Sequence, residues 1–225
     1  MHVIPLGFDL DKFQENISEK RKTFRDQYKI TEKEIVISII GRLVPVKNHS
    51  LFLRSLKIVL ENSKQKIRAF IIGDGEERKN IESLAKNLGI NFSDGTTPAT
   101  LTFTSWRKDI DVVCAGSDII TLTSFNEGTP VSLIEAQAGN KPIVTTNVGG
   151  IQNVIIPNET GFLINSFDAK DFSNALLKLS ENEELRTQMG AKGWKQVKEN
   201  YHYTRLVSDM DSLYKRLLHS SKSDN

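Results

Sequence analysis

Cysteine, long apolar runs and an excess of charge of one sign are all scarce in this sequence, and each absence excludes a class of protein. The 225 residues include one cysteine, Cys114, so neither a disulfide within the chain nor a thiol-rich metal site can form. No apolar run approaches the roughly 20 residues that a membrane-spanning helix needs. The opening MHVIPLGFDLDKF lacks the pattern of a signal peptide. These absences predict a cytoplasmic protein.

The charge balance argues against nucleic acid, and against a membrane surface, as the main partner. Lys and Arg number 30 against 28 Asp and Glu, which leaves a formal net charge of +2, and the basic residues are spread along the chain. With 38% hydrophobic residues, the chain is apolar enough to fold as one large globular domain. Cys114 lies in the apolar segment DVVCAGSDII, so we interpret it as a small core residue.

Short apolar runs rich in Ile and Val alternate with longer helical patterns, which is typical of a parallel sheet built from strand and helix units. Strands are predicted at residues 34–40, 67–72, 101–104, 118–123, 142–146 and 161–164, and helices at 49–62, 76–88, 108–116, 131–139 and 169–180. Because most of these strands are continuously apolar, helices should cover both faces. The sequence therefore predicts an α/β fold, a Rossmann-like doubly wound parallel sheet of about six strands with C-terminal helices.

No linker or internal repeat divides the chain. Residues 1–180 carry the α/β pattern and residues 181–225 carry only helical pattern, so we assign the second range to a helical extension of the same domain. One face of the last helix should carry an apolar stripe, whose members recur at spacings of four, three and four: Leu206, Met210, Leu213 and Leu217. Such a stripe needs a partner surface.

In an open parallel sheet, ligands bind beyond the carboxyl ends of the strands, so the loops after the strands are the candidate sites. The loop GRLVPVKN after the first strand brings Arg42 and Lys47 ahead of a helix. Two cations there suit a pyrophosphate, Arg as a fork and Lys as a point charge. The alternative is that both are simply solvated, as cations at strand ends usually are.

The loop GDGEER after the second strand does not complete a dinucleotide fingerprint. Gly73 and Gly75 begin one, but Arg78 stands where the third glycine should be. The pattern GxxxxGK[ST] is also absent, which excludes a P-loop ATPase. We interpret this loop as a turn between a strand and a helix, with ligand contact as the alternative.

The segment SFNEGTPVSLIEA, residues 124–136, is the strongest candidate for an anion site. Thr129 is placed to cap a helix and Pro130 suits its first turn. A helix that begins at the carboxyl end of a strand offers free N–H groups and the positive end of its dipole, which bind phosphate without a metal. The expected donors are the N–H groups of Gly128, Thr129, Val131 and Ser132.

Two carboxylates flank this anion site, Glu127 just before it and Glu135 inside the helix. Taken singly, the first could be an acidic residue that favours a helix start, and the second a surface position on an amphipathic helix. Together with Arg42 and Lys47 they favour a ligand that carries hydroxyl groups as well as phosphates. A sugar supplies hydroxyls on one side and a ribose supplies them on the other.

These residues together resemble the glycosyltransferases of group 1 with GT-B architecture, whose signature is two glutamates separated by seven residues. Here the signature is Glu127 and Glu135 with GTPVSLI between them. The blocks VIPLGFDLDKF, GRLVPVKN, IIGDGEE, TTNVGGIQNVI and NETGFLI follow the family in the same order. The resemblance runs from about residue 3 to residue 180.

The resemblance implies the C-terminal, donor-binding domain of a retaining enzyme that transfers a hexose-type sugar from a nucleoside diphosphate sugar. Arg42 and Lys47 would hold the pyrophosphate, Glu127 would contact the hydroxyls of the transferred sugar, and Glu135 would hold the ribose. Glu127, Arg42 and Lys47 are thereby the implied catalytic residues. The family uses no essential metal and no further cofactor.

The resemblance also places the nucleotide base near the segment after the third predicted strand, at Phe103, Thr104 and Trp106. In one detail the chain departs from the family, because it reads AGN at residues 138–140 where AAG is common. Asn140 should then close the turn, which Asn tolerates.

Family members carry a preceding domain that binds the acceptor and supplies a catalytic histidine. We therefore expect the 225 residues alone to bind donor without turnover, and the stripe on the last helix to meet that domain or to promote self-association of the chain. The full-length enzyme would work in the cytoplasm, free or at the inner face of the membrane.

Two other functions are open at this stage. One is a non-catalytic nucleotide-sugar-binding module, and the other is a nucleotide-sugar epimerase, which would need its own catalytic carboxylates and a histidine. The glutamate pair favours the transferase. The sequence does not name the sugar, the base or the acceptor, and it does not choose between front-face attack and a covalent intermediate.

Overall fold

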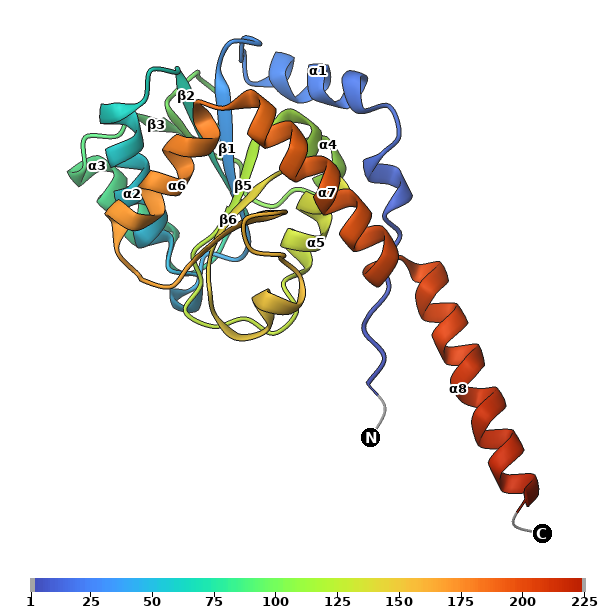
Figure 1. Cartoon of the computed structure of the whole chain (residues 1–225). Coiled ribbons are helices and arrows are strands. Elements are labelled where there is room, and N and C mark those ends of the chain that lie inside the picture. Colours follow the sequence, from blue (N-terminus) through green and yellow to red (C-terminus); the bar gives the residue numbers. More distant parts are fainter. Residues whose placement is uncertain (1–2, 224–225) are drawn as a thin grey trace.

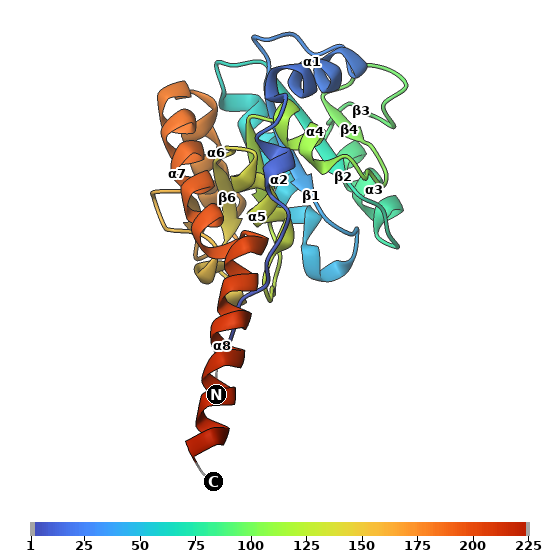
Figure 2. The same ribbon diagram turned by 90° about the vertical axis from the view of Figure 1, so that its right-hand side faces the viewer.

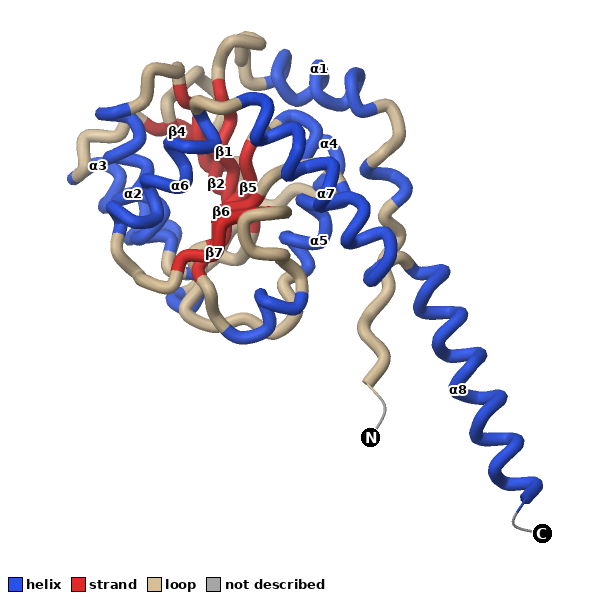
Figure 3. The backbone as a smooth tube through the Cα atoms, viewed as in Figure 1, coloured by secondary structure: helices blue, strands red, loops and turns tan. Residues whose placement is uncertain are grey.

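A seven-stranded, fully parallel sheet forms the centre of the molecule (Figure 1, Figure 3). The computed structural model describes residues 3–223, in which the strand order is β3-β4-β2-β1-β5-β6-β7. The order reverses between β1 and β5, as in a doubly wound fold. The predicted Rossmann-like α/β class is confirmed, with seven strands in place of about six.

The strands are β1 (Ile35–Ile40), β2 (Ile67–Ile72), β3 (Phe92–Ser93), β4 (Leu101–Phe103), β5 (Ile119–Leu122), β6 (Ile143–Thr146) and β7 (Gly161–Ile164). The helices are α1 (Ile17–Gln27), α2 (His49–Asn62), α3 (Arg78–Asn87), α4 (Ile110–Gly116), α5 (Val131–Ala138), α6 (Ala169–Ser180), α7 (Glu183–Tyr201) and α8 (Tyr203–Ser223). Short 3₁₀ helices occur at Asp11–Phe13, Pro45–Lys47 and Gly149–Asn153. Each predicted strand and helix is present.

The sequence pattern does not predict β3 and α1, because both carry a weak apolar signal. β3 is two residues long and pairs only with β4. α1 buries only Phe24 and Arg25, so it lacks the apolar stripe that marks an amphipathic helix. Arg25 is 1% exposed, and its Nη2 lies 2.7 Å from Oδ2 of Asp118.

Helices cover both faces of the sheet, which explains why the strands read as continuously apolar. In β1, Ile37 packs into a core cluster with residues of α2, α3 and α6, whereas its neighbour Val36 packs with residues of α1, α4 and α5. α7 lies across the edge between the two layers, since Met189 belongs to the first cluster and Val197 to the second. The views of Figure 1 and Figure 2 show these two layers.

The C-terminal helix α8 leaves the body of the molecule beside the N-terminal segment (Figure 1, Figure 2). The Arg205 guanidinium donates to two backbone carbonyls of that segment, and a side chain at Gly7 would collide with Leu206. The far end of the predicted stripe has less cover, because Leu217 is 56% exposed. Within residues 3–223, no helix is long and apolar enough to cross a membrane.

Cys114 in α4 and Asn140 after α5 agree with the predictions made for them from sequence. Cys114 is fully buried, and burial raises the pKa of its thiol, as expected of a core residue. Asn140 closes the turn after α5 with a φ of 56°. Its side-chain amide donates to Oε1 of Gln14 at 3.2 Å, which ties the turn to the N-terminal segment.

The GDG turn after β2 is built for close contact between two loops. Gly73 has a φ of +135°, and a Cβ there would lie 2.1 Å from the Gly41 carbonyl oxygen. A Cβ at Gly75 would lie 2.4 Å from the carbonyl oxygen of Leu43. The two glycines therefore let the loop after β2 support the loop after β1, which favours the interpretation of this motif as a structural turn.

We predict that Gly73→Ala lowers the free energy of unfolding by about 3 kcal/mol or more, because it adds a backbone collision to an unfavourable φ. Gly89→Ala is the matched control, since Gly89 also has a positive φ, +68°, but a Cβ there meets nothing within 4 Å. The control should lose only about 1 kcal/mol. Urea unfolding of both variants measures the difference, and equal losses would contradict the proposed loop contact.

His49 begins α2 as a buried, neutral imidazole. It is 3% exposed, and neither ring nitrogen has a hydrogen-bond partner in the described part of the chain. Burial lowers its pKa from the ordinary 6.5 to about 4, with a further contribution from nearby Lys47. The folded state therefore resists a protonation that the unfolded chain accepts.

This lowered pKa predicts acid sensitivity between pH 6.5 and 4. In that window the unfolded chain binds a proton at His49 that the folded chain does not, so stability falls as the pH falls, by about 3 kcal/mol in total. His49→Leu should remove this part of the pH dependence and leave stability at pH 8 about unchanged. Urea unfolding of parent and variant across the window tests this, and parallel pH profiles would refute it.

Candidate functional site

The loops that follow β1 and β5 lie together at the carboxyl edge of the sheet, where the strand order reverses. The Thr123 hydroxyl donates to the carbonyl of Lys47 at 3.0 Å, and the N–H of Phe125 donates to the carbonyl of Val46 at 2.8 Å. These bonds hold the two loops as one unit. Doubly wound folds bind their ligands at this switch point, so both loops meet at the candidate site.

The Lys47 ammonium joins the two loops through its side chain. Its Nζ lies 2.5 Å from Oε1 of Glu127, and the Ser124 hydroxyl donates to the same oxygen at 2.6 Å. The side chains of Lys47 and Glu127 are 21% and 10% exposed, so the ion pair is partly shielded from solvent. The sequence indicates both charged residues but not Ser124. The one sequence feature that relates Ser124 to the site is its position three residues before Glu127.

The backbone of Glu127 is held by the loop after β6. The N–H of Gly150 donates to the Glu127 carbonyl at 2.9 Å. A Cβ at Gly149 would lie 2.0 Å from the same oxygen, and Gly149 has a φ of +52°. The glycine pair of the block TTNVGGIQNVI therefore allows a third loop to approach the site and fix the position of Glu127.

Arg42 lies exposed on the same loop as Lys47. Among residues 3–223, its guanidinium has no hydrogen-bond or ion-pair partner. An exposed, unpaired guanidinium on the loop that carries Lys47 is available to an anionic ligand. No contact joins Arg42 to Lys47 among the described residues, so its role in the site stays a prediction.

The start of α5 differs in one respect from the prediction. Thr129 is not the N-cap; Pro130 occupies that position with an extended ψ of 97°, and no side chain caps the helix. Since the helix begins at Val131, Pro130 lies before the first turn rather than in it, and Thr129 lies one position too early to be the N-cap.

The missing cap leaves the backbone donors of this helix start open. In the described part of the chain, no acceptor is bonded to the N–H groups of four residues, Gly128, Thr129, Val131 and Ser132. The first N–H engaged in the helix is that of Leu133, which donates to the Pro130 carbonyl at 3.1 Å. Free donors at a positive helix end form an anion-binding site.

Glu135 lies farther along α5, between the 3₁₀ helix of Lys12 and the start of α4. It is partly buried, and that burial raises the pKa of its carboxyl above the ordinary value; Lys12 opposes the shift and Asp111 adds to it. The carboxylate has no hydrogen-bond or ion-pair partner within residues 3–223. Glu127 therefore lies in the loop before α5 and Glu135 within the helix, and Lys12 is a neighbour of Glu135 that the sequence did not indicate.

The predicted base-binding segment needs a correction at Phe103. Its side chain is 1% exposed and packs edge-on against Phe92 in the core, because every residue of β4 is buried between covered faces of the sheet. It therefore cannot stack on a base. Thr104 is half-buried and its hydroxyl donates to the carbonyl of Ser105, so its role stays a prediction. Trp106, at 62% exposure, is the aromatic side chain that this segment presents to solvent.

The described residues contain no group of three or more His, Cys, Asp and Glu side chains that could hold a metal ion. The charges at the candidate site are instead the Lys47–Glu127 pair, Arg42 and Glu135, arranged around the open end of α5. This set can hold a phosphate on cations and backbone N–H groups, and can accept hydrogen bonds from hydroxyl groups on two carboxylates.

Comparison with known proteins identifies the family to which the chain is similar. The model of the family described as glycosyl transferases group 1 matches residues 20–196. A relative from Escherichia coli, UDP-Gal:alpha-D-GlcNAc-diphosphoundecaprenol alpha-1,3-galactosyltransferase, is 31% identical over 218 residues, which cover 94% of this chain and 53% of the relative. The chain spans about half the length of the curated relatives it matches.

Solved structures share the fold. The Anabaena protein Alr3699/HepE, crystallised with UDP and glucose, matches with a TM-score of 0.81 and 19% identity over 95% of this chain and 56% of its own. The C-terminal domain of a glycosyl transferase group 1 family protein (LpcC) from Francisella tularensis matches with a TM-score of 0.71 and 22% identity, over 87% of this chain and 99% of its own. The matched residues 20–196 make up most of the chain and include the whole sheet and both loops of the candidate site. The chain belongs to the glycosyl transferases of group 1.

Proposed function

We propose that this chain is the donor-binding half of a retaining glycosyltransferase that takes a hexose from a nucleoside diphosphate sugar. The observation that carries the proposal is the Lys47–Glu127 pair beside the open N-terminus of α5. Family membership favours transfer over the alternatives of epimerisation and of a purely binding module. UDP is the first nucleotide to test, because the Escherichia coli relative is named for UDP-Gal and HepE was crystallised with UDP.

The proposed chemistry is the stabilisation of a departing diphosphate. The bond between the anomeric carbon and the diphosphate oxygen breaks, and the bonding electrons leave with the diphosphate. The oxygen of an acceptor hydroxyl bonds to the same face of the anomeric carbon, and the proton of that hydroxyl passes to the departing diphosphate. Negative charge grows on the leaving group, towards which Arg42, Lys47 and the free N–H groups of α5 would direct fixed positive charge. No metal is required for this stabilisation.

The Lys47–Glu127 contact suits a donor that has both phosphates and hydroxyls. The two side chains neutralise each other at 2.5 Å, and a sugar diphosphate offers each of them a new partner. Sugar hydroxyls would donate to Glu127, while the diphosphate would attract Lys47. Ser124 keeps one hydrogen bond on the Glu127 carboxylate during this exchange.

Glu135 would hold the ribose. Its carboxylate has no partner in the described chain and is partly buried, and two ribose hydroxyls would supply the hydrogen bonds that a buried carboxylate requires. Trp106, exposed at the end of β4, would face the base. The acceptor and a catalytic histidine would come from a preceding domain, and α8 would contact that domain through its apolar stripe.

We predict that Arg42→Ala and Lys47→Ala each weaken UDP binding by about 1 to 3 kcal/mol, because each removes a charge-assisted contact to the diphosphate. Calorimetric titration of the 225-residue chain measures the loss. Arg54→Ala is the matched control, since Arg54 is an exposed arginine on α2, and it should bind UDP as the parent does. Parent-like affinity in both site variants would overturn the pyrophosphate assignment.

The two glutamates should respond differently to the same pair of ligands. Glu135→Ala should weaken UDP and UDP-sugar alike, through the lost ribose contact. Glu127→Ala should weaken only the UDP-sugar, and should leave UDP binding unchanged or stronger because Lys47 is released from its ion pair. Glu199→Ala, an exposed position on α7, serves as the control. Losses of equal size for both ligands in both variants would rule out this division of roles.

A further inference from the structure

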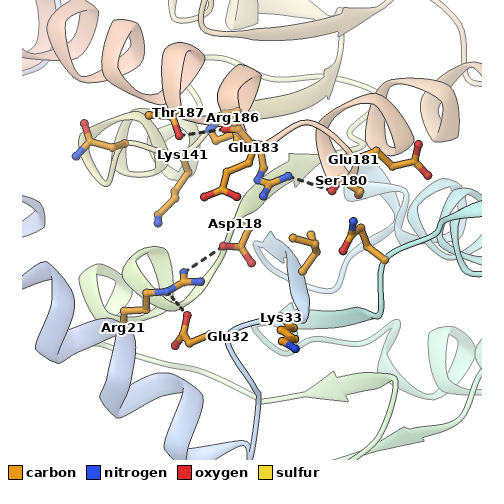
Figure 4. A pocket seen from close by; sticks show the side chains of 14 residues that line it. Arg21, Glu32, Lys33, Asp118, Lys141, Ser180, Glu181, Glu183, Arg186 and Thr187 are labelled. Atoms are coloured by element: carbon orange, nitrogen blue, oxygen red, sulfur yellow. Dashed lines mark hydrogen bonds and ion pairs between the residues drawn. The ribbon is translucent and has the colours of Figure 1, made fainter.

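A cavity of about 810 Å³ lies at the amino ends of the strands, on the edge of the sheet opposite the donor loops (Figure 4). Its wall includes the starts of β1 and β6, the end of α6 and the first turn of α7, together with Arg21 from α1. None of the residues assigned to the donor site lines it. The cavity is therefore separate from the proposed transferase function.

The carboxylate at the centre of the cavity, that of Asp118, accepts hydrogen bonds from two guanidiniums and a backbone N–H. Oδ1 of Asp118 accepts from Arg21 at 3.1 Å, and Oδ2 accepts from Arg25 at 2.7 Å and from the N–H of Val36 at 2.8 Å. Arg21 also bonds Glu32 at 3.1 Å. Asp118 thus pairs with two guanidiniums and accepts from one backbone N–H, and the nearby ammonium of a third cation is not among these partners.

Lys141 is that third cation, and it lacks a counter-ion. Its ammonium extends into the cavity (Figure 4), where its one hydrogen bond is to the carbonyl of Ala115 at 3.3 Å. Within residues 3–223 no carboxylate lies within 4.0 Å of it. Its pKa is lowered to about 8, mainly by burial; Asp118 opposes this shift, and Arg21 and Arg25 add to it. Buried charges in proteins are normally paired.

Two more groups on the α6 and α7 side of the cavity are incompletely satisfied. Arg186 donates to the carbonyls of Leu179 and Ser180, at 2.6 and 3.0 Å, and has no carboxylate within 4.0 Å among the described residues. The Ser180 hydroxyl is buried and has no hydrogen-bond partner there. The rim beside them carries two acids, Glu181 and Glu183.

We propose that this cavity binds a small hydroxylated oxyanion, a phosphorylated polyol or a hydroxycarboxylate. The oxyanion would pair with Lys141, within reach of the cations on the opposite wall, and so supply the missing counter-ion. The hydroxyl groups of the ligand would donate to the rim acids and accept from Ser180. An anion without hydroxyl groups would leave the rim acids and Ser180 unpaired, and a cation would be repelled by the ammonium of Lys141.

Isothermal titration of the 225-residue chain with glycerol 3-phosphate and with citrate tests the proposal, and glycerol is the uncharged control. At least one oxyanion should bind, and Lys141→Met should weaken it by tenfold or more. Ser180→Ala, a milder change that keeps the charges, should weaken it several-fold. The double variant with Arg42→Ala and Lys47→Ala should bind as the parent does, because it alters only the donor site.

A proton count separates the cavity from the donor site. Because the pKa of Lys141 is about 8, pairing it with an anion at pH 8 should take up about half a proton, measured by repeating the titration in buffers of different ionisation enthalpy. The uptake should vanish in Lys141→Met. No binding of either oxyanion, undiminished binding in both cavity variants, or binding lost in the donor-site double variant would each overturn the proposal.

Discussion

The contact between Lys47 and Glu127 joins the two loops on which the donor site depends. One loop follows β1 and the other follows β5, and these strands are neighbours in the sheet although about 80 residues separate the two side chains. An ion pair at 2.5 Å with little exposure is worth more than a surface pair, but it is also costly to desolvate. The hydroxyl of Ser124 offsets part of that cost, and the hydrogen bonds from Thr123 and Phe125 to the other loop hold the two charges close together.

The glycines of this site lack a side chain and its proline lacks an N–H, and both absences shape the site. Gly73, Gly75, Gly149 and Gly150 carry no side chain where neighbouring loops approach within contact distance, so four loops meet at one edge of the sheet. Pro130 provides no N–H, and the helix after it begins without a side-chain cap. In a capped helix, a backbone N–H of the first turn donates to the side chain of the N-cap residue. Here those N–H groups stay available to a ligand.

An element can be predicted from sequence when the pattern that stabilises it lies within its own residues. β1 and α2 have long apolar patterns of this kind. By contrast, α1 is held by Phe24 and by the pairing of Arg25 with a residue 93 positions away, which a local pattern does not reveal. The site motifs could be placed because loops after parallel strands share an edge. The position of Phe103 near a strand end predicts a contact with the base, but the sequence does not show that its side chain is buried in the core while that of Trp106 is exposed.

The helix α5 connects the two edges of the sheet electrostatically. Its positive end lies at the donor loops, Glu135 lies between its ends, and the turn at Asn140 leads directly to Lys141 at the opposite edge. A cation just beyond a helix C-terminus is favoured by the helix dipole, which helps Lys141 to remain in its position without a carboxylate partner. An anion bound in the cavity would neutralise Lys141 at the negative end of this eight-residue helix. The positive end of the same helix is the one proposed to hold the diphosphate. Gln14 and the close approach of Gly190 to Asn140 hold α5 at its C-terminal end.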